Sequence, residues 1–363
     1  MIYLDYQATT PLAPEALAAM LPWLESQHAN PHSAHAPGRA AKAAVEAARD
    51  DVAALMPVGG AVSFTSGATE ALNWAIKGTT GPIVTLASEH AAVLDTVEAE
   101  ARKGRDVTVL PLGSDGLVDL AAARAAIRPG TRLVAAMLVN NEIGTIQPVE
   151  QLADLARAAG ALFLCDAVQG YGRTRIPDGC DLVAVSAHKI HGPKGVGALW
   201  IRDGVTLDPL LHGGGQEPAG RSGTLSPALC AGFGAAARLA KQRFGADHAH
   251  AEQLFRAALA HLDGDWILNG SRDERYHGNL NIRRKGLDVA RLMSDLRDIA
   301  FSAGSACASG SGRPSHVLRA IGLADNEARS SIRLGFGRYT TEEELLTALD
   351  RIIAAARSQK VAA

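Results

Sequence analysis

The chain has 363 residues, a formal net charge of −2, a pI near 6.6 and 47% hydrophobic residues. This length exceeds what one hydrophobic core usually serves, so two domains are expected. Lysines and arginines are scattered, which leaves no basic field for nucleic acid. No apolar run approaches the ~20 residues that span a bilayer, and no signal sequence follows Met1, so we expect a cytoplasmic protein without a membrane role.

The predicted elements begin with an extended arm, residues 3–11, and a helix from Pro14 to about Glu25. A long alanine-rich helix over 38–55 follows. From Ala61 onward strands and helices alternate, which is typical of a parallel, doubly wound α/β sheet. The predicted strands are 62–64, 83–86, 107–110, 133–139, 162–165 and 182–187, and the helices between them are 71–77, 92–103, 120–127 and 149–159.

A polar, alanine-rich helical segment over 238–262 changes the composition, and we place a domain boundary near Phe244. The large domain is then 15–244, and a smaller α+β domain covers 245–363. The arm 1–14 joins the two. The smaller domain is predicted to contain strands 280–283, 299–301 and 332–336 and helices 289–296, 317–321 and 342–355.

Lys189 follows the apolar run 182–187, where a buried strand gives way to a loop with glycines and a proline. Open α/β sheets bind ligands at this edge. An amine partly desolvated there would have a depressed pKa and could form a Schiff base with a carbonyl. Lys194 is a competing lysine that spacing does not exclude, and an ordinary solvated loop lysine is the plain alternative.

Other strand ends carry residues of the same kind. In 65–70 the backbone N–H groups and the Thr69 hydroxyl can face a phosphate, although a capped helix is the alternative. Asp166 closes strand 162–165 and, if buried, needs a cation such as a protonated pyridine nitrogen; capping the next turn is the alternative. His90 follows strand 83–86. The glycine-rich stretch 212–224 is either an anion-binding loop or a flexible connection.

Four cysteines show no C-x-x-C pairing, which predicts neither a zinc site nor a disulfide scaffold. His188 and His191 have no third ligand nearby in sequence, so we expect no metal site. Cys307 differs from Cys165, which lies among apolar residues. The small residues around Cys307 give a thiol the reach and exposure that a nucleophile needs, with an incidental loop cysteine as the alternative.

Taken together, these segments resemble the cysteine desulfurases of the class V aminotransferase group through nearly the whole chain. The resemblance implies the fold of pyridoxal-phosphate-dependent transferases of the aspartate aminotransferase type, type I. The motifs that carry it are residues 3–5, 8–11, 30–31, 65–70, 89–90, 140–144, 166–169, 186–195, 212–215, 221–224, 304–307 and 330–333.

The resemblance also implies roles for individual residues. Lys189 holds pyridoxal 5′-phosphate, Asp166 pairs with its ring nitrogen, Gln169 bonds its phenolic oxygen and His90 stacks on its ring. The phosphate is held by Ala68, Thr69, Ser186 and His188, with Thr224 from the second subunit of a homodimer. Asn141 and Arg333 match positions that contact the substrate carboxylate, and Arg338 is a less close alternative to Arg333.

The implied reaction takes sulfur from L-cysteine. The Lys189 amine removes the α-proton, Cys307 attacks the substrate sulfur to give a persulfide and L-alanine, and His90 moves a proton to or from the thiol. The persulfide sulfur passes to an acceptor protein for iron–sulfur cluster, thio-cofactor or tRNA biosynthesis. The glycine-rich 308–313 departs from the family pattern and leaves the acceptor open. Two alternatives are a selenocysteine lyase or other aminotransferase, and a non-enzymatic sulfur-assembly scaffold.

Overall fold

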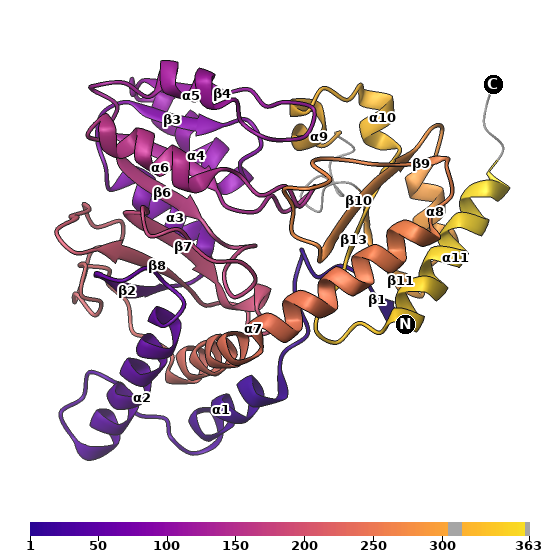
Figure 1. Cartoon of the computed structure of the whole chain (residues 1–363). Helices are drawn as coiled ribbons and strands as arrows, with labels where there is room; N and C mark the ends of the chain where they lie inside the picture. The colour runs from indigo at the N-terminus through magenta and orange to yellow at the C-terminus, as the bar shows by residue number, and fades with distance from the viewer. Residues whose placement is uncertain (304–313, 360–363) are drawn as a thin grey trace.

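The computed structural model describes residues 1–303 and 314–359 (Figure 1). A seven-stranded sheet has the order β2-β8-β7-β6-β5-β3-β4. Its strands are β2 (Gly60–Thr65), β3 (Ile83–Leu86), β4 (Val107–Leu110), β5 (Leu133–Met137), β6 (Leu162–Asp166), β7 (Leu182–Ser186) and β8 (Gly197–Arg202). The strands β4, β3, β5, β6 and β7 pair in parallel, as the alternation of elements predicts.

Strand β8 is the exception to this parallel arrangement, because it runs antiparallel to both β2 and β7. The chain returns directly from β7 through the short 3₁₀ turn η1 (Ala187–Lys189) and a glycine-containing loop. A parallel neighbour would have required a longer crossover connection. The tight return holds the predicted lysine segment at the end of β7.

Helices cover both faces of this sheet, so the doubly wound prediction is confirmed. On one face α2 (Ala36–Ala53), α6 (Val149–Ala158) and the first half of α7 (Pro227–His261) bury Val45, Leu152 and Phe233 in one core. On the other face α3 (Ala68–Lys77) and α4 (Ala91–Arg102) bury Trp74 and Val97. The remaining helices of this part are α1 (Pro14–Glu25) and α5 (Leu120–Ala126).

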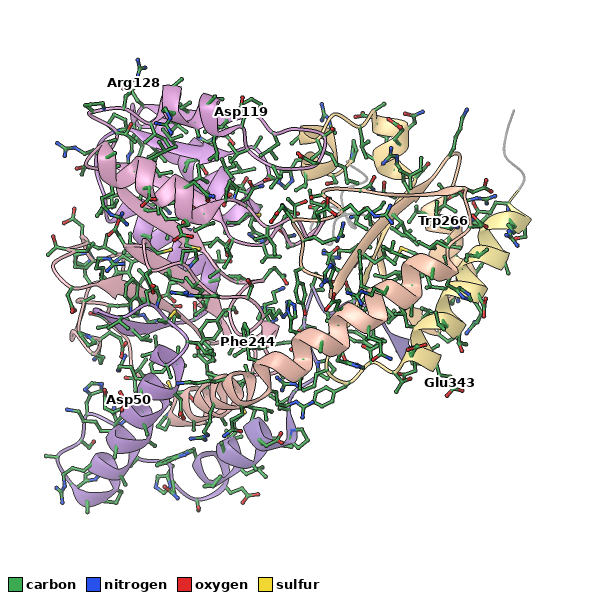
Figure 2. All side chains as sticks on the ribbon, in the orientation of Figure 1. Asp50, Asp119, Arg128, Phe244, Trp266 and Glu343 are labelled. Atoms are coloured by element: carbon green, nitrogen blue, oxygen red, sulfur yellow. The ribbon has the colours of Figure 1, made fainter. Side chains whose placement is uncertain are left out.

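Helix α7 is a single 35-residue element that passes through Phe244, where we placed the domain boundary. Its first half packs against the large sheet through Phe233 and Ala240. Its second half buries Leu254 and Phe255 in a separate core. Figures 1 and 2 show α7 running from one part of the molecule into the other, with Phe244 near its middle. One continuous helix therefore connects the two cores.

The second core surrounds a four-stranded antiparallel sheet of order β12-β13-β10-β9. The strands are β9 (Trp266–Leu268), β10 (Asn279–Arg284), β12 (Ser302–Ala303) and β13 (Ser331–Gly335), and the helices are α8 (Val289–Asp295), α9 (His316–Ala320), α10 (Asp325–Arg329) and α11 (Glu342–Ser358). The amino-terminal strand β1 (Ile2–Tyr3) pairs in parallel with β11 (Ile299–Ala300). The arm thus reaches the second core, where Leu4 is fully buried.

Among the described residues no helix combines the length and apolarity that crossing a membrane requires. The same part of the chain contains no group of three or more His, Cys, Asp or Glu side chains suited to a metal ion.

Candidate active site

A cavity of about 470 Å³ opens at the carboxyl ends of β2, β5, β6 and β7, the edge where open α/β sheets bind ligands. Its volume is ordinary for a small-molecule site. Its lining is formed by Gln7, Ala8, Ser66, Gly67, Ala68, Thr69, Leu72, His90, Met137, Val139, Asn141, Asp166, Val168, Gln169, Ser186, His188, Lys189, Lys194, Gly195 and Arg333. Most of the predicted site residues therefore meet in one cavity.

Lys189 is held at the cavity wall by the amino-terminal arm. Its Nζ donates to the backbone carbonyls of Gln7 at 2.5 Å and Ala8 at 2.7 Å. Its own carbonyl accepts a hydrogen bond from the Arg173 guanidinium. Lys194 also lines the cavity and is exposed. The two lysines thus share the cavity, and among the described residues the carbonyls of the arm fix the amine of Lys189.

Asp166 ends β6 with 5% of its surface exposed, and its Oδ1 accepts the Val168 amide at 3.0 Å. Burial raises the pKa of this carboxyl, while the neighbouring His90 limits the rise. A buried carboxylate is stabilised as an anion by an adjacent cation. Asp166 therefore suits a ligand that brings a protonated nitrogen into the cavity.

His90 occupies the N-cap position of α4, and its Nδ1 accepts the Ala92 amide at 3.0 Å. This bond leaves the ring proton on Nε2. Burial lowers the pKa of His90, and the charge of Asp166 opposes that effect. The imidazole is consequently neutral near neutral pH, a form that can both give and accept a proton.

Helix α3 begins at Ala68 after Gly67, and no side chain caps its amino terminus. The first turn lines the cavity, so its free backbone amides favour an anion there. Ser186 and His188 lie at the same place from the end of β7. Burial lowers the pKa of His188 to about 4, so its ring is neutral at neutral pH. This end of the cavity is suited to a phosphate.

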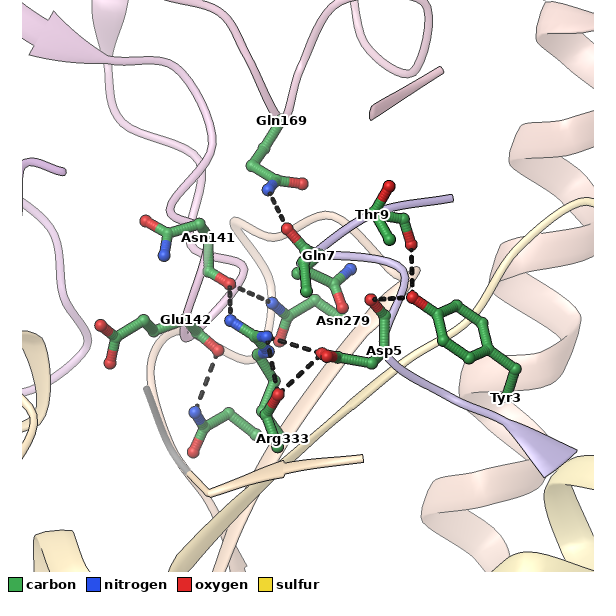
Figure 3. Close-up of polar contacts among 12 residues, drawn as sticks. Tyr3, Asp5, Gln7, Thr9, Asn141, Glu142, Gln169, Asn279 and Arg333 are labelled. Atoms are coloured by element: carbon green, nitrogen blue, oxygen red, sulfur yellow. Dashed lines mark hydrogen bonds and ion pairs between the residues drawn. The ribbon is translucent and has the colours of Figure 1, made fainter. Parts of the chain in front are cut away.

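Gln169 is fixed in position by two contacts. Its Nε2 donates to the Gln7 carbonyl at 3.0 Å (Figure 3). Its Oε1 accepts from Arg173 at 2.8 Å. Thr224, by contrast, is exposed and does not line the cavity of its own chain.

Arg333 lies on β13 and brings a guanidinium from the second core to the cavity. It donates to the Asn141 carbonyl at 3.1 Å, to Asp5 Oδ1 at 2.7 Å and to Ser302 Oγ at 3.2 Å (Figure 3). The alternative arginine, Arg338, does not line the cavity. Of the two predicted candidates for carboxylate binding, Arg333 alone is at the site.

Arg338 is instead committed to a different contact. Its Nε and Nη2 bind Asp247 Oδ2 at 2.8 and 2.7 Å. This ion pair joins α7 to the segment after β13, and neither residue lines the cavity.

These side chains and backbone amides fit a ligand with three features. They are an anionic group for the amino terminus of α3, a protonatable nitrogen for Asp166 and an electrophilic carbonyl for Lys189. Cys307 lies outside the described residues. Of the described residues on either side of it, Ser302 accepts a hydrogen bond from Arg333 in the cavity wall, and Ser315 donates to the buried Glu142, the neighbour of Asn141. The other cysteines, Cys165, Cys180 and Cys230, are buried.

Sequence patterns did not identify the carbonyls of Gln7 and Ala8 as contacts of Lys189. They also missed the apolar wall formed by Leu72, Met137 and Val139. A backbone carbonyl can come from any residue, so no side-chain pattern marks these contacts.

The model of the aminotransferase class-V family matches residues 2–347. The chain belongs to the class-V aminotransferase family. Among curated proteins, the chain is 44% identical to the cysteine desulfurase IscS of Rickettsia bellii, over 95% of the chain and 88% of that protein. It is 43% identical to the probable mitochondrial cysteine desulfurase of Schizosaccharomyces pombe, over 97% of the chain and 73% of that protein.

Solved structures agree with these relatives. A NifS-like protein superposes with a TM-score of 0.89 at 32% identity, covering 97% of this chain and 99% of its own. The structure of SspA in complex with cysteine superposes with a TM-score of 0.83 at 35% identity, covering 94% of this chain and 100% of its own. The predicted fold and the predicted resemblance to cysteine desulfurases are confirmed.

Proposed function

We propose that this protein is a cysteine desulfurase that uses pyridoxal 5′-phosphate to take sulfur from L-cysteine. The observation that carries the proposal is the cavity in which a lysine amine, a buried aspartate and an uncapped helix terminus converge. The relatives named cysteine desulfurase, at 42–44% identity, support the same substrate. So does the neighbouring structure that was solved with cysteine.

Pyridoxal phosphate, when bound, supplies an electron sink for a carbanion formed beside the substrate nitrogen. In this proposal Lys189 holds the cofactor through its amine, and Asp166 keeps a proton on the ring nitrogen. The first turn of α3, with Ser186 and His188, holds the phosphate. Gln169 would bond the phenolic oxygen of the cofactor, and His90 would stack on its ring, as the family resemblance implies.

The chain's own residues then move protons and sulfur. The Lys189 amine, released from the cofactor when the amine of L-cysteine takes its place, removes the proton from the substrate Cα. The Cys307 thiolate attacks the substrate sulfur, so that a sulfur–sulfur bond forms as the carbon–sulfur bond breaks. The electron pair of the broken bond stays with the carbon skeleton, which gains protons and leaves as L-alanine. His90, which is neutral and close to Asp166, moves a proton to or from the thiol of L-cysteine. The net change is one sulfur atom moved from L-cysteine to Cys307.

Two partners complete the proposal. The exposed Thr224 reaches the cofactor phosphate of a second copy in a homodimer. An acceptor protein takes the sulfur from Cys307 for cluster, cofactor or tRNA thiolation. The carboxylate of L-cysteine binds between Asn141 and Arg333, since both line the cavity and Arg333 carries the charge.

The test combines a spectrum with product analysis. The purified protein should absorb visible light as a pyridoxal protein does, and it should form L-alanine from L-cysteine in a ratio of about one to the sulfide released under reducing conditions. Visible absorbance with alanine formation that does not need Cys307 would favour a selenocysteine lyase or another aminotransferase. A protein that cannot be loaded with the cofactor would favour a non-enzymatic scaffold.

A further inference from the structure

Four successive backbone carbonyls after β5, those of residues 141–144, are each bound by the segment 275–281 of the second core. The Asn141 carbonyl accepts from Asn279 Nδ2 at 3.3 Å, and the Glu142 carbonyl accepts from Asn281 Nδ2 at 3.0 Å. The Ile143 carbonyl accepts from Arg275 Nη2 at 3.0 Å, and the Gly144 carbonyl accepts from the Tyr276 amide at 2.8 Å. Figure 3 shows the first two of these contacts.

The side chains that donate to this loop are buried. Asn279, Asn281 and Arg275 are 1%, 0% and 4% exposed. The Asn281 amide is oriented by Asn269, whose Nδ2 donates to Asn281 Oδ1 at 2.8 Å, so that Nδ2 of Asn281 faces the loop. A buried carbonyl that loses its donor costs more than the bond itself was worth. The contacts therefore fix the backbone of residues 141–144.

Arg275 is a buried guanidinium that contacts backbone carbonyls and an aromatic ring. It donates to the Ser271 and Asn279 carbonyls as well as to Ile143, and its charge lies 4.9 Å from the Phe255 ring centre. Burial lowers the pKa of Arg275 to about 10, so it remains charged at neutral pH. Charged donors make stronger hydrogen bonds to carbonyls than neutral donors do.

Strand β10, which carries Asn279 and Asn281, also fixes Arg333. Asn281 on β10 lies directly opposite Arg333 on β13, and the Arg333 Nη1 shares the Asn141 carbonyl with Asn279. Asn141 follows the large sheet, whereas Arg333 belongs to the small sheet. The clamp, which we define as Arg275, Asn279 and Asn281, therefore ties two cavity residues from different cores to one strand.

We propose that Arg275, Asn279 and Asn281 are positioning residues that hold Asn141 and Arg333 as one preassembled receptor for a substrate carboxylate. The carboxylate part rests on the function proposed above. A displacement of about 1 Å in such a receptor can cost about 100-fold in rate or affinity. By bonding the loop to the strand that pairs with Arg333, the clamp prevents the two sides from moving apart.

The test compares Asn281→Leu with Ile282→Val, a neighbour on β10 whose side chain packs into the second core and points to the opposite face of the strand from Asn281. Asn281→Leu removes the donor to Glu142 at similar side-chain size. We expect its KM for L-cysteine and its dissociation constant for L-alanine, followed by the cofactor spectrum, to rise about tenfold with kcat within about twofold. Ile282→Val should lower the melting temperature and leave both constants unchanged.

Hydrogen exchange provides a readout that needs no turnover. In Asn281→Leu the amides of residues 142–146 should exchange about tenfold faster than in the parent, and in Ile282→Val they should not. If Asn281→Leu fails to fold, Asn279→Ala carries the same expectation in milder form, because the Asn141 carbonyl keeps its bond to Arg333.

Unchanged exchange in Asn281→Leu overturns the clamp. Faster exchange with an unchanged KM for L-cysteine and an unchanged dissociation constant for L-alanine overturns the role of the clamp in carboxylate binding. Failure of the proposed function gives a different result, because the parent protein would then bind neither L-cysteine nor L-alanine. In that case the proposed role in carboxylate binding is wrong, and hydrogen exchange in residues 142–146 still tests whether the clamp fixes the loop.

Discussion

Replacing Arg333 by methionine tests which arginine receives the substrate carboxylate. The side chain is 1% exposed, lines the cavity and bonds Asp5 and the Asn141 carbonyl. Methionine keeps the length and removes the charge. A hydrogen bond to a charged group is worth about 1.5–3 kcal/mol, which corresponds to a rise of about 10- to 150-fold in KM for L-cysteine. The loss of the Asp5 partner should also lower the melting temperature.

Arg338→Met is the matched control, because it removes a guanidinium that is 5% exposed and paired with Asp247 outside the cavity. It should lower the melting temperature and leave KM within about twofold of the parent. The assay is alanine formation over a range of L-cysteine concentrations, with melting temperatures measured in parallel. The assignment fails if Arg338→Met raises KM as much as Arg333→Met does, or if Arg333→Met leaves KM unchanged.

Four further outcomes are expected. Lys189→Ala should abolish both the visible cofactor absorbance and turnover, whereas Lys194→Ala should keep the absorbance; a normal spectrum in Lys189→Ala would contradict the assignment. Asp166→Ala should fold but lose most activity, because the ring nitrogen loses its carboxylate partner, and parental turnover would refute this. Cys307→Ser should bind the cofactor and respond spectrally to L-cysteine without releasing alanine efficiently, and peptide mass spectrometry of the parent should locate the extra sulfur on Cys307. Burial lowers the pKa of His191 from 6.5 to about 3, so the unfolded chain binds this proton first and stability falls as pH drops from about 6.5 towards 3. At about pH 4.5 this effect should lower the free energy of unfolding by about 2–3 kcal/mol. In the variant His191→Asn, whose asparagine tolerates the positive φ of 69° at this position, the melting temperature should fall less between about pH 7.5 and pH 4.5 than in the parent. An equal fall in both proteins would argue against this role of His191.

The sequence predicted the large sheet well because its strands are short apolar runs between turn residues. The ends of these runs placed Asp166 and Lys189 at one edge, where the structure also has them. Strand β8 and helix α10 (Asp325–Arg329) were not predicted. Strand β8 immediately follows a glycine-rich loop that masks its start, and α10 is too short and polar to show a helical period.

Choosing between Arg333 and Arg338 required tertiary structure. Arg333 is the middle residue of β13 and Arg338 follows the end of that strand, and composition does not distinguish them. The difference is that Arg333 pairs across the sheet with Asn281, whereas Arg338 meets Asp247 on α7. The register between β10 and β13, which are far apart in sequence, decides which guanidinium reaches the cavity. No local pattern in the sequence reveals that register.

The amino-terminal arm shows most clearly why part of the site was not predictable. Leu4 is buried in the second core and Ala13 in the first, so the residues between them cross from one to the other. On the way, the carbonyls of Gln7 and Ala8 hold the Lys189 amine, and Asp5 holds Arg333 (Figure 3). The arm therefore sets the position of the lysine in one core relative to the arginine in the other. It does so largely through backbone atoms, whose direction depends on where both ends of the arm are buried.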